Sequence, residues 1–199
     1  MPISNRIILT DVDGVLLEWE NHFTKWMISK GYQLQPNMQS EYNMHVRFGE
    51  EPGIVKSRIR EFNCSAWMAT QEPMPGSVQW VRLLHAEGWT FVPITSQTSD
   101  LPAQALRKRR LAEVFGSDVF SNYFILETGA DKDSVLEEFR GTGLYWVEDK
   151  WANAVAGLKY GLKSILIDHQ YNREFNHPDI VRVNNWEQIH KVVSGKIKK

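Results

Sequence analysis

Two carboxylates and a glycine follow a short apolar run near the start of the chain. Residues 6–15 read Arg-Ile-Ile-Leu-Thr-Asp-Val-Asp-Gly-Val, so Asp11 and Asp13 stand two residues apart. In a strand such residues share one face, where their charges would repel each other unless a cation or a proton lay between them. The pattern predicts a metal-assisted carboxylate site at the carboxyl end of a strand, where open α/β sheets bind ligands. An Asp-Gly turn closing a hairpin is disfavoured, because no alternating pattern follows that would form a second strand.

Further polar residues lie at the ends of other apolar runs or at expected helix starts. Thr95 and Ser96 follow one such run and offer hydroxyl groups to an anion, although hydroxyl residues after strands are also common helix caps. Lys132 lies at an expected helix start, where a surface lysine is the ordinary alternative. Glu148 and Asp149 end another apolar run. Asp149 could cap the next helix, but two consecutive acids at a strand end favour a functional site.

The elements that must position these residues alternate between strand and helix. We expect a first strand that ends at Thr10, further strands at 90–95, 123–126, 144–147 and 164–167, and helices at 75–87, 102–115, 133–139 and 152–160. Pro93 is an unusual residue for the centre of a strand. Such alternation predicts an α/β fold with a Rossmann-like parallel sheet covered by helices on both faces.

The region after the first strand has a different pattern. Residues 23–28 follow a helical stripe that stops near Gly31, residues 54–62 form another short amphipathic segment, and residues 36–44 between them are poorly periodic. We therefore expect a small helical cap at 18–70, inserted into an α/β core formed by 1–17 and 71–199.

Composition excludes several classes of protein. The chain has 199 residues, 42% of them hydrophobic, which is enough for one good core. Its net charge of -1 gives no reason to expect a nucleic-acid polymer or an anionic membrane as partner. Cys64 is the only cysteine, which excludes an internal disulfide and a zinc site built from several cysteines. Without a leader-like start or a membrane-length apolar run, a soluble cytoplasmic protein is expected.

Taken in order, the polar residues resemble the four motifs of the haloacid dehalogenase (HAD) superfamily of phosphoryl-transfer enzymes, over nearly the full chain. Residues 11–15 resemble the first motif, Thr95 the second, Lys132 the third, and Glu148-Asp149 with Asn153 the fourth. The resemblance implies that Asp11 is the nucleophile and that Asp13 protonates the leaving oxygen and later activates water. It also implies that Thr95 and Lys132 hold the phosphoryl oxygens.

The same resemblance implies a Mg²⁺ cofactor. Asp11, the backbone carbonyl of Asp13 and Asp149 would bind the ion through hard oxygen ligands. One residue departs from the usual motif, because Glu148 stands where many members have Asp or Gly. Its longer side chain could reorient Lys132 or crowd the metal.

Within the superfamily, residues 11–19, 71–78 and 92–96 resemble the 5'(3')-deoxyribonucleotidases. That likeness implies that aromatic cap residues hold the base, here Trp19, Phe48 and Phe62, with core packing of the cap as the alternative for each ring. Ser96 and Lys150 are further candidates for substrate binding. Lys150 stands where those relatives have an arginine, and Ser99 where they often have a phosphate-contacting lysine.

We therefore expect a Mg²⁺-dependent phosphatase for a small phosphorylated metabolite, with a deoxynucleoside monophosphate as the first candidate substrate. A sugar phosphate or another small phosphoester is the alternative within the same chemistry. A catalytically silent HAD-fold binding module is the alternative of another class, and the presence of Asp11, Asp13, Lys132 and Asp149 together argues against it. A homodimer is compatible with the sequence.

Two other features are given structural interpretations. The six histidines show no paired metal-ligand spacing on a helix, which favours packing or surface roles. The basic run 107–110 lies in an expected amphipathic helix, so a solvated helix face is the preferred interpretation and contact with a polyanion the alternative.

Overall fold

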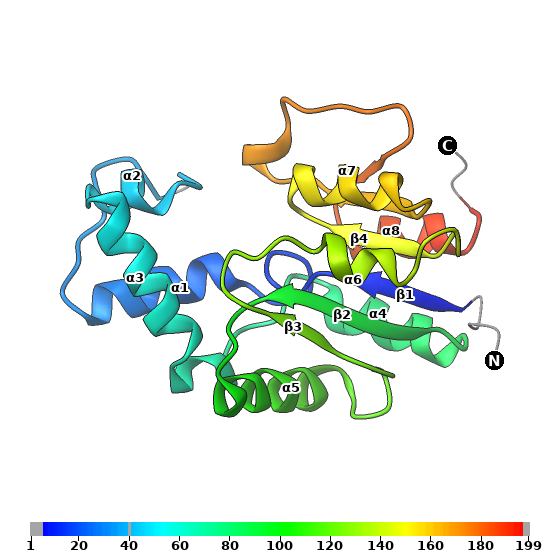
Figure 1. The fold of residues 1–199 in the computed structure, drawn as a ribbon, viewed down its shortest axis with the longest axis horizontal. Helices are drawn as coiled ribbons and strands as arrows, with labels where there is room; N and C mark the ends of the chain where they lie inside the picture. Colours follow the sequence, from blue (N-terminus) through cyan, green and yellow to red (C-terminus); the bar gives the residue numbers. More distant parts are fainter. Residues whose placement is uncertain (1–5, 40, 197–199) are drawn as a thin grey trace.

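A six-stranded parallel sheet forms the centre of the molecule (Figure 1). The computed structural model describes residues 6–39 and 41–196. The strands are β1 (Ile7–Thr10), β2 (Thr90–Ser96), β3 (Phe124–Leu126), β4 (Tyr145–Glu148), β5 (Lys163–Ile167) and β6 (Val181–Val183). Their order is β3-β2-β1-β4-β5-β6, so the direction of winding reverses between β1 and β4. The predicted α/β class with a parallel sheet is confirmed, and the reversal is where open sheets of this kind bind ligands.

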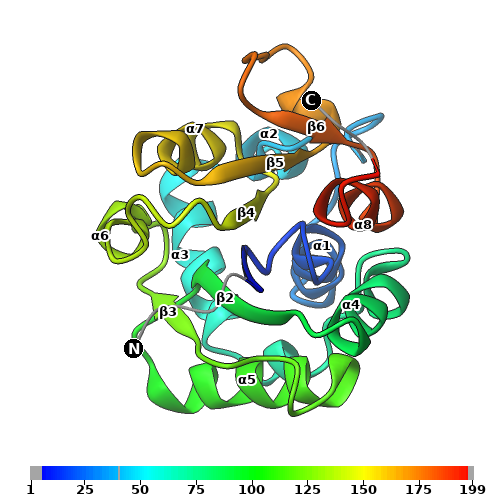
Figure 2. The same ribbon diagram turned by 90° about the vertical axis from the view of Figure 1, so that its right-hand side faces the viewer.

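Helices cover both faces of the sheet (Figure 2). Successive strand residues point to opposite faces, and apolar residues on each face pack against the helices. On one face, Ile8 shares an apolar cluster with residues of α4 (Ser77–Ala86), α5 (Leu101–Phe115) and α8 (Trp186–Val193). On the other face, the next residue, Leu9, packs with residues of α6 (Asp133–Glu137) and with Tyr160, which follows α7 (Trp151–Lys159). The two cores hold the strands rigidly, and therefore also the residues that directly follow them.

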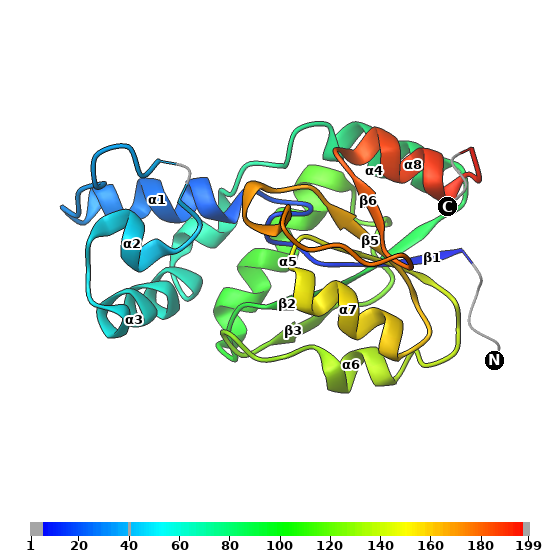
Figure 3. The same cartoon turned by 90° about the horizontal axis from the view of Figure 1, so that it is seen from above.

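A separate group of helices lies beside the sheet, between β1 and α4 in the sequence (Figures 1 and 3). It contains α1 (Trp19–Ser29), α2 (Met44–Phe48), α3 (Pro52–Asn63) and the short 3-10 helix η1 (Ala66–Ala69). These helices have their own apolar cluster, and Leu106 of α5 packs against it. We call residues 18–70 the cap.

Some elements differ from the sequence expectation. Pro93 lies within β2, opposite Thr10 of β1. The backbone N–H of Phe91 donates to Val119 O on the β3 side of β2, and strand N–H groups alternate in direction, so the N–H that Pro93 lacks would face the same side. Pairing with β3 begins only at Ile94, and the ladder therefore loses little.

The sequence pattern did not indicate α2, β6 or α8. α2 and β6 are five and three residues long, too short to show a clear period. The first helix of the cap begins at Trp19, whereas the apolar stripe in the sequence begins four residues later, at Phe23.

Candidate active site

Asp11 and Asp149 follow directly after the neighbouring strands β1 and β4, at the point where the winding of the sheet reverses. The Asp11 backbone N–H donates to Val147 O, which extends the pairing of the two strands by one residue. Both residues are 8% exposed. Asp149 does not cap a helix, because the residue before α7 is Lys150 and no side chain caps that helix end. The paired strands thus bring the two carboxylates together.

The loop after Asp11 turns tightly at Gly14, whose φ of 77° is unfavourable for residues with a side chain. The N–H groups of Val15, Leu16 and Leu17 all point to Val12 O. A methyl carbon added at Gly14 would lie 2.3 Å from Asp149 Oδ2. Glycine is therefore required both for the turn and for the close approach of Asp149.

Lys132 lies between Asp11 and Glu148. Its Nζ is 2.8 Å from Asp11 Oδ2 and 2.6 Å from Glu148 Oε1, and the side chain is buried. Lys132 directly precedes α6, which positions it beside the carboxyl ends of the central strands. Lys132 is thus a buried ion-pair partner and not a surface lysine.

Glu148 accepts hydrogen bonds on both carboxylate oxygens and is fully buried. Oε1 accepts from Lys132 Nζ at 2.6 Å and from Asn153 Nδ2 at 2.7 Å. Oε2 accepts from the backbone N–H groups of Asp149 at 2.9 Å and Lys150 at 2.7 Å. All four partners are donors, so the surroundings suit an ionised carboxylate. Glu148 therefore orients Lys132 and the chain after β4.

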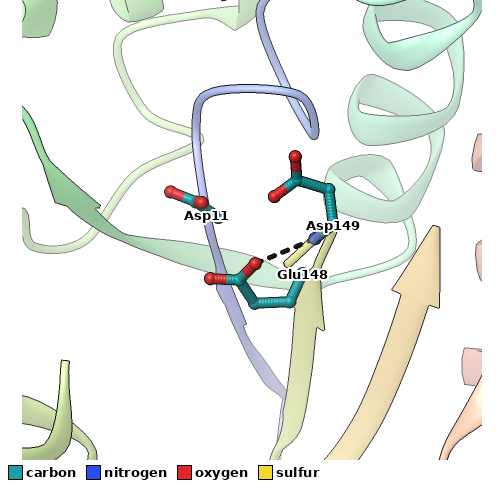
Figure 4. A group of neighbouring side chains, drawn as sticks. All are labelled: Asp11, Glu148 and Asp149. Atoms are coloured by element: carbon teal, nitrogen blue, oxygen red, sulfur yellow. Dashed lines mark hydrogen bonds between the residues drawn. The ribbon is translucent and has the colours of Figure 1, made fainter. Parts of the chain in front are cut away.

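Asp11, Glu148 and Asp149 each have a carboxylate oxygen, and these three oxygens lie within 4.8 Å of one another (Figure 4). Oxygen ligands of this kind suit a hard divalent cation. Because both oxygens of Glu148 are already used by four donors, Asp11 and Asp149 are the better ligands.

Burial shapes the electrostatics of this cluster. Burial raises the pKa of Asp11 to about 7, against the opposing effect of Lys132. Burial, followed by the charge of Asp11, raises the pKa of Asp149 to about 6. Burial also raises the pKa of Glu148. For Lys132, burial lowers the pKa, but the negative charges of Asp11 and Glu148 together outweigh this effect and raise it. One lysine thus faces three buried acids, and a bound cation would relieve their repulsion.

Thr95 and Ser96 end β2, the strand on the other side of β1. Ser96 Oγ donates to Ala130 O at 2.8 Å. Thr95 is 1% exposed, and its Oγ1 has no hydrogen-bond partner among the described residues. A buried hydroxyl without a partner is costly, so the Thr95 hydroxyl is available for a ligand oxygen.

Asp13 pairs with Arg107 of α5. Arg107 Nη1 lies 2.5 Å from Asp13 Oδ1, and Nη2 lies 3.3 Å from Oδ2. Arg107 is fully buried, while the Asp13 side chain is 24% exposed. The preferred interpretation of the basic run as a solvated helix face is therefore wrong for Arg107. It is also incomplete for Arg110, whose Nε donates to Gln71 O at 2.7 Å.

A cavity of about 1030 Å³ lies between the cap and the ends of the strands. From the core it is lined by residues that include Asp11, Asp13, Thr95, Ser96, Lys132, Asp149 and Lys150. From the cap it is lined by residues that include Trp19, Tyr42, Ile59 and Asn63. The cavity thus gives a ligand simultaneous access to the acidic cluster and to the cap.

The three predicted aromatic contacts have different environments. Trp19 lines the cavity, stacks on Phe23 with ring centroids 4.9 Å apart, and donates from Nε1 to Asn63 Oδ1 at 2.9 Å. Phe48 and Phe62 are 2% and 0% exposed, belong to the apolar cluster of the cap and do not line this cavity. Their burial favours core packing, the alternative interpretation, over contact with a substrate.

Solved structures with this architecture are known. A haloacid dehalogenase-like hydrolase family protein from Streptococcus pneumoniae is 11% identical and aligns over 94% of this chain and 98% of its own, with a TM-score of 0.66. A "predicted phosphatase" from Clostridium acetobutylicum is 17% identical over 96% and 98% of the two chains, with a TM-score of 0.70. The chain has the haloacid dehalogenase-like fold.

A third HAD-fold structure is the D,D-heptose 1,7-bisphosphate phosphatase from B. bronchiseptica, in complex with magnesium and phosphate. It is 14% identical over 96% of this chain and 99% of its own, with a TM-score of 0.57. A curated nucleotidase from Clostridium acetobutylicum is 35% identical over 54 residues. That match covers 27% of this chain and 28% of the relative's length. No protein-family model matches the chain.

The resemblance to the HAD superfamily is confirmed at the level of the fold. The residues matched to the four HAD motifs, Asp11, Asp13, Thr95, Lys132 and Asp149, all line one cavity. Among the described residues, no helix is long and apolar enough to cross a membrane.

Sequence reasoning missed several residues of this HAD-fold site. Tyr171 donates its hydroxyl to Asp149 Oδ2, and His169 Nε2 lies 3.0 Å from Gly14 O. Tyr171 also stacks on Tyr42 of the cap, with ring centroids 3.9 Å apart. His169 and Tyr171 follow β5, the strand beside β4, so their position after an apolar run was the available signal. Nothing local in the sequence could pair Tyr42 or Arg107 with a partner so distant in the chain.

Proposed function

We propose that this chain is a Mg²⁺-dependent phosphatase that hydrolyses small phosphomonoesters through a phosphoryl group carried on Asp11. The observation that carries the proposal is the Asp11 carboxylate, bound by Lys132 at 2.8 Å on the wall of a cavity that Thr95 also lines. A carboxylate nucleophile beside a lysine and an unpartnered hydroxyl suits the transfer of a phosphoryl group from a dianionic phosphomonoester.

In the proposed reaction an Asp11 oxygen attacks phosphorus, and the bond from phosphorus to the ester oxygen breaks. Asp13 donates its proton to that leaving oxygen. Asp13 then takes a proton from the water that attacks the acyl phosphate, which releases inorganic phosphate and regenerates Asp11. Lys132, oriented by Glu148, and the Thr95 hydroxyl would bind the phosphoryl oxygens.

The acidic cluster fits a Mg²⁺ ion. Asp11 and Asp149 would supply carboxylate oxygens, and the HAD resemblance adds the backbone carbonyl of Asp13. When bound, the cation would offset the repulsion between Asp11 and the phosphate. The raised pKa values of Asp11 and Asp149 are consistent with a site that binds a cation, since each carboxylate is buried near other acids.

Deoxynucleoside monophosphates are the proposed substrate class. The Trp19 ring lines the same cavity as Asp11, where it could contact a base while phosphorus lies at the carboxylate. The short match to a nucleotidase agrees with this choice. Sugar phosphates and other small phosphoesters are the alternative, since they would use the same core residues without stacking.

A phosphate-release screen tests the proposal. Nucleotides, deoxynucleotides and sugar phosphates would be tested with Mg²⁺ and with a chelator, using Asp11→Asn as a variant of nearly equal volume. We expect Mg²⁺-dependent release that is greatest for deoxynucleotides and lost in Asp11→Asn. Preference for sugar phosphates would change the substrate class, and no release from any ester would favour a binding module.

A further inference from the structure

Arg107 occupies a position where an apolar residue is expected. The inward face of α5 consists of Ala103, Arg107, Leu111 and Phe115, spaced four residues apart and each no more than 1% exposed. Four-residue spacing forms one stripe along a helix. Arg107 therefore lies in the middle of the buried stripe and is its one charged member.

The described groups around Arg107 provide hydrogen-bond partners for the terminal nitrogens of the guanidinium only. The two terminal nitrogens face Asp13, and Nη2 also lies 3.4 Å from Met68 Sδ in η1 of the cap. Arg107 Nε has no hydrogen-bond partner among the described residues. Replacing a buried ion pair by apolar residues is often neutral or stabilising, so folding alone does not account for a guanidinium here.

The two buried basic residues of the site bind different carboxylates. Lys132 binds Asp11 and Glu148, whereas Arg107 binds Asp13. A guanidinium is planar and offers donors in a fixed fork, so it fixes both the position and the rotation of a carboxylate. Arg107 can thus hold Asp13 in one orientation on the cavity wall, independently of Lys132.

The two oxygens of Asp13 lie at different distances from the guanidinium of Arg107. Asp13 Oδ1 lies 2.5 Å from Nη1, whereas Oδ2 lies 3.3 Å from Nη2. We infer that Arg107 is a positioning residue that holds Asp13 mainly through Oδ1, so that Oδ2, the more weakly bound oxygen, exchanges a proton with the leaving oxygen. The inference rests on the proposed phosphatase function and adds a residue that no HAD motif in this chain contains.

The expected consequence is a dependence on the leaving group. Loss of the P–O bond places negative charge on the ester oxygen, and the Asp13 proton neutralises it. A weakly basic leaving group needs this proton little, and a strongly basic one needs it greatly. A series of substituted phenyl phosphates varies this basicity at nearly constant size, so contacts with the cap stay the same. The value of kcat/KM reports the steps up to release of the leaving group.

The test compares this series in wild type, Arg107→Met, Arg107→Lys and Asp13→Asn. The matched control is Arg109→Ala, from the same basic run, whose side chain is exposed and pairs with Glu113. For the most basic leaving group we expect Arg107→Met to lose about 10²- to 10⁴-fold in kcat/KM, the usual contribution of a positioned acid. The loss should shrink toward the least basic leaving group, Arg107→Lys should fall between, and Arg109→Ala should match wild type.

A double variant separates positioning from a general structural effect. In an Asp13→Asn background, Arg107→Lys should not steepen the leaving-group dependence further, because the acid it positions is gone. If Arg107→Met does not fold, Arg107→Lys gives the same comparison. A uniform loss across the series, or an equal change with and without Asp13, would overturn the inference while leaving the phosphatase intact. No hydrolysis by wild type would instead overturn the proposed function, and the inference with it.

Discussion

Replacing Glu148 by glutamine tests whether this residue organises the site or binds the metal. The carboxylate accepts four hydrogen bonds, two on each oxygen. An amide has one accepting oxygen, so its NH₂ group must face either Lys132 and Asn153 or the two backbone N–H groups. In both orientations two donors lose their acceptor, one of them buried and the other partly buried.

The magnitude follows from that count. A buried donor left without a partner costs about 1–3 kcal/mol. Two such donors, one of them charged in one orientation, give a loss of roughly 3–5 kcal/mol, the range found when one partner of a buried ion pair is removed. A typical domain is stable by only about 5–15 kcal/mol, so Glu148→Gln should be visibly destabilised.

Urea unfolding at pH 7 measures this loss, and calorimetry measures Mg²⁺ affinity in the same samples. The control is Glu137→Gln, whose carboxylate is exposed and pairs with Arg140, and no measurable change is expected there. Mg²⁺ affinity should fall much less in Glu148→Gln than in Asp149→Asn. An unchanged unfolding free energy would refute the organising role, and an equal loss of affinity in the two variants would make Glu148 a metal ligand.

Three further predictions concern the neighbouring groups. Gly14→Ala should lower the free energy of unfolding by about 1–2 kcal/mol, because residue 14 has a positive φ. The added methyl carbon would lie 2.3 Å from Asp149 Oδ2, so calorimetry should also show weakened Mg²⁺ binding. Burial raises the pKa of Asp11 from 3.8 to about 7, so between these values the folded protein binds a proton that the unfolded chain does not. With a chelator present, the free energy of unfolding should therefore fall as the pH rises from about 4 to 7. Urea titrations should show a smaller fall for Asp11→Asn, and an equal fall would contradict the assignment. Trp19→Ala should lower kcat/KM for deoxynucleotides by the equivalent of about 1–3 kcal/mol but hardly affect a small phosphoester without a ring, which does not reach the cap. Equal losses on both substrates would make the Trp19 ring a packing residue of the cap.

The local pattern was sufficient for β1 to β5 of the central sheet, but not for β6. Strands followed by helices gave the layers, and the acids after β1 and β4 could be placed together because neighbouring parallel strands end at the same edge. Thr95 and Lys132 could be named as candidates for the same reason, since each lies at an element boundary. Such signals depend only on residues close together in the chain.

Residues whose role depends on a distant partner were not predictable in this way. Arg107 and Asp13 are 94 positions apart, and a run of basic residues on a helix is usually solvated. The cap aromatics Phe48 and Phe62 resemble base-binding residues in type, but their burial depends on how the cap helices pack. The role of Glu148 likewise emerges only once Lys132, Asn153 and two backbone N–H groups surround it.

Identifying the residue that carries phosphate during turnover tests the central claim most directly. The enzyme would be quenched in acid while it hydrolyses an active phosphomonoester with Mg²⁺, then digested and analysed by peptide mass spectrometry. We expect one phosphoryl group on Asp11, removable by hydroxylamine as an acyl phosphate must be, and no such group in Asp11→Asn. Phosphate on another residue, or phosphate release by Asp11→Asn at the wild-type rate, would contradict the account.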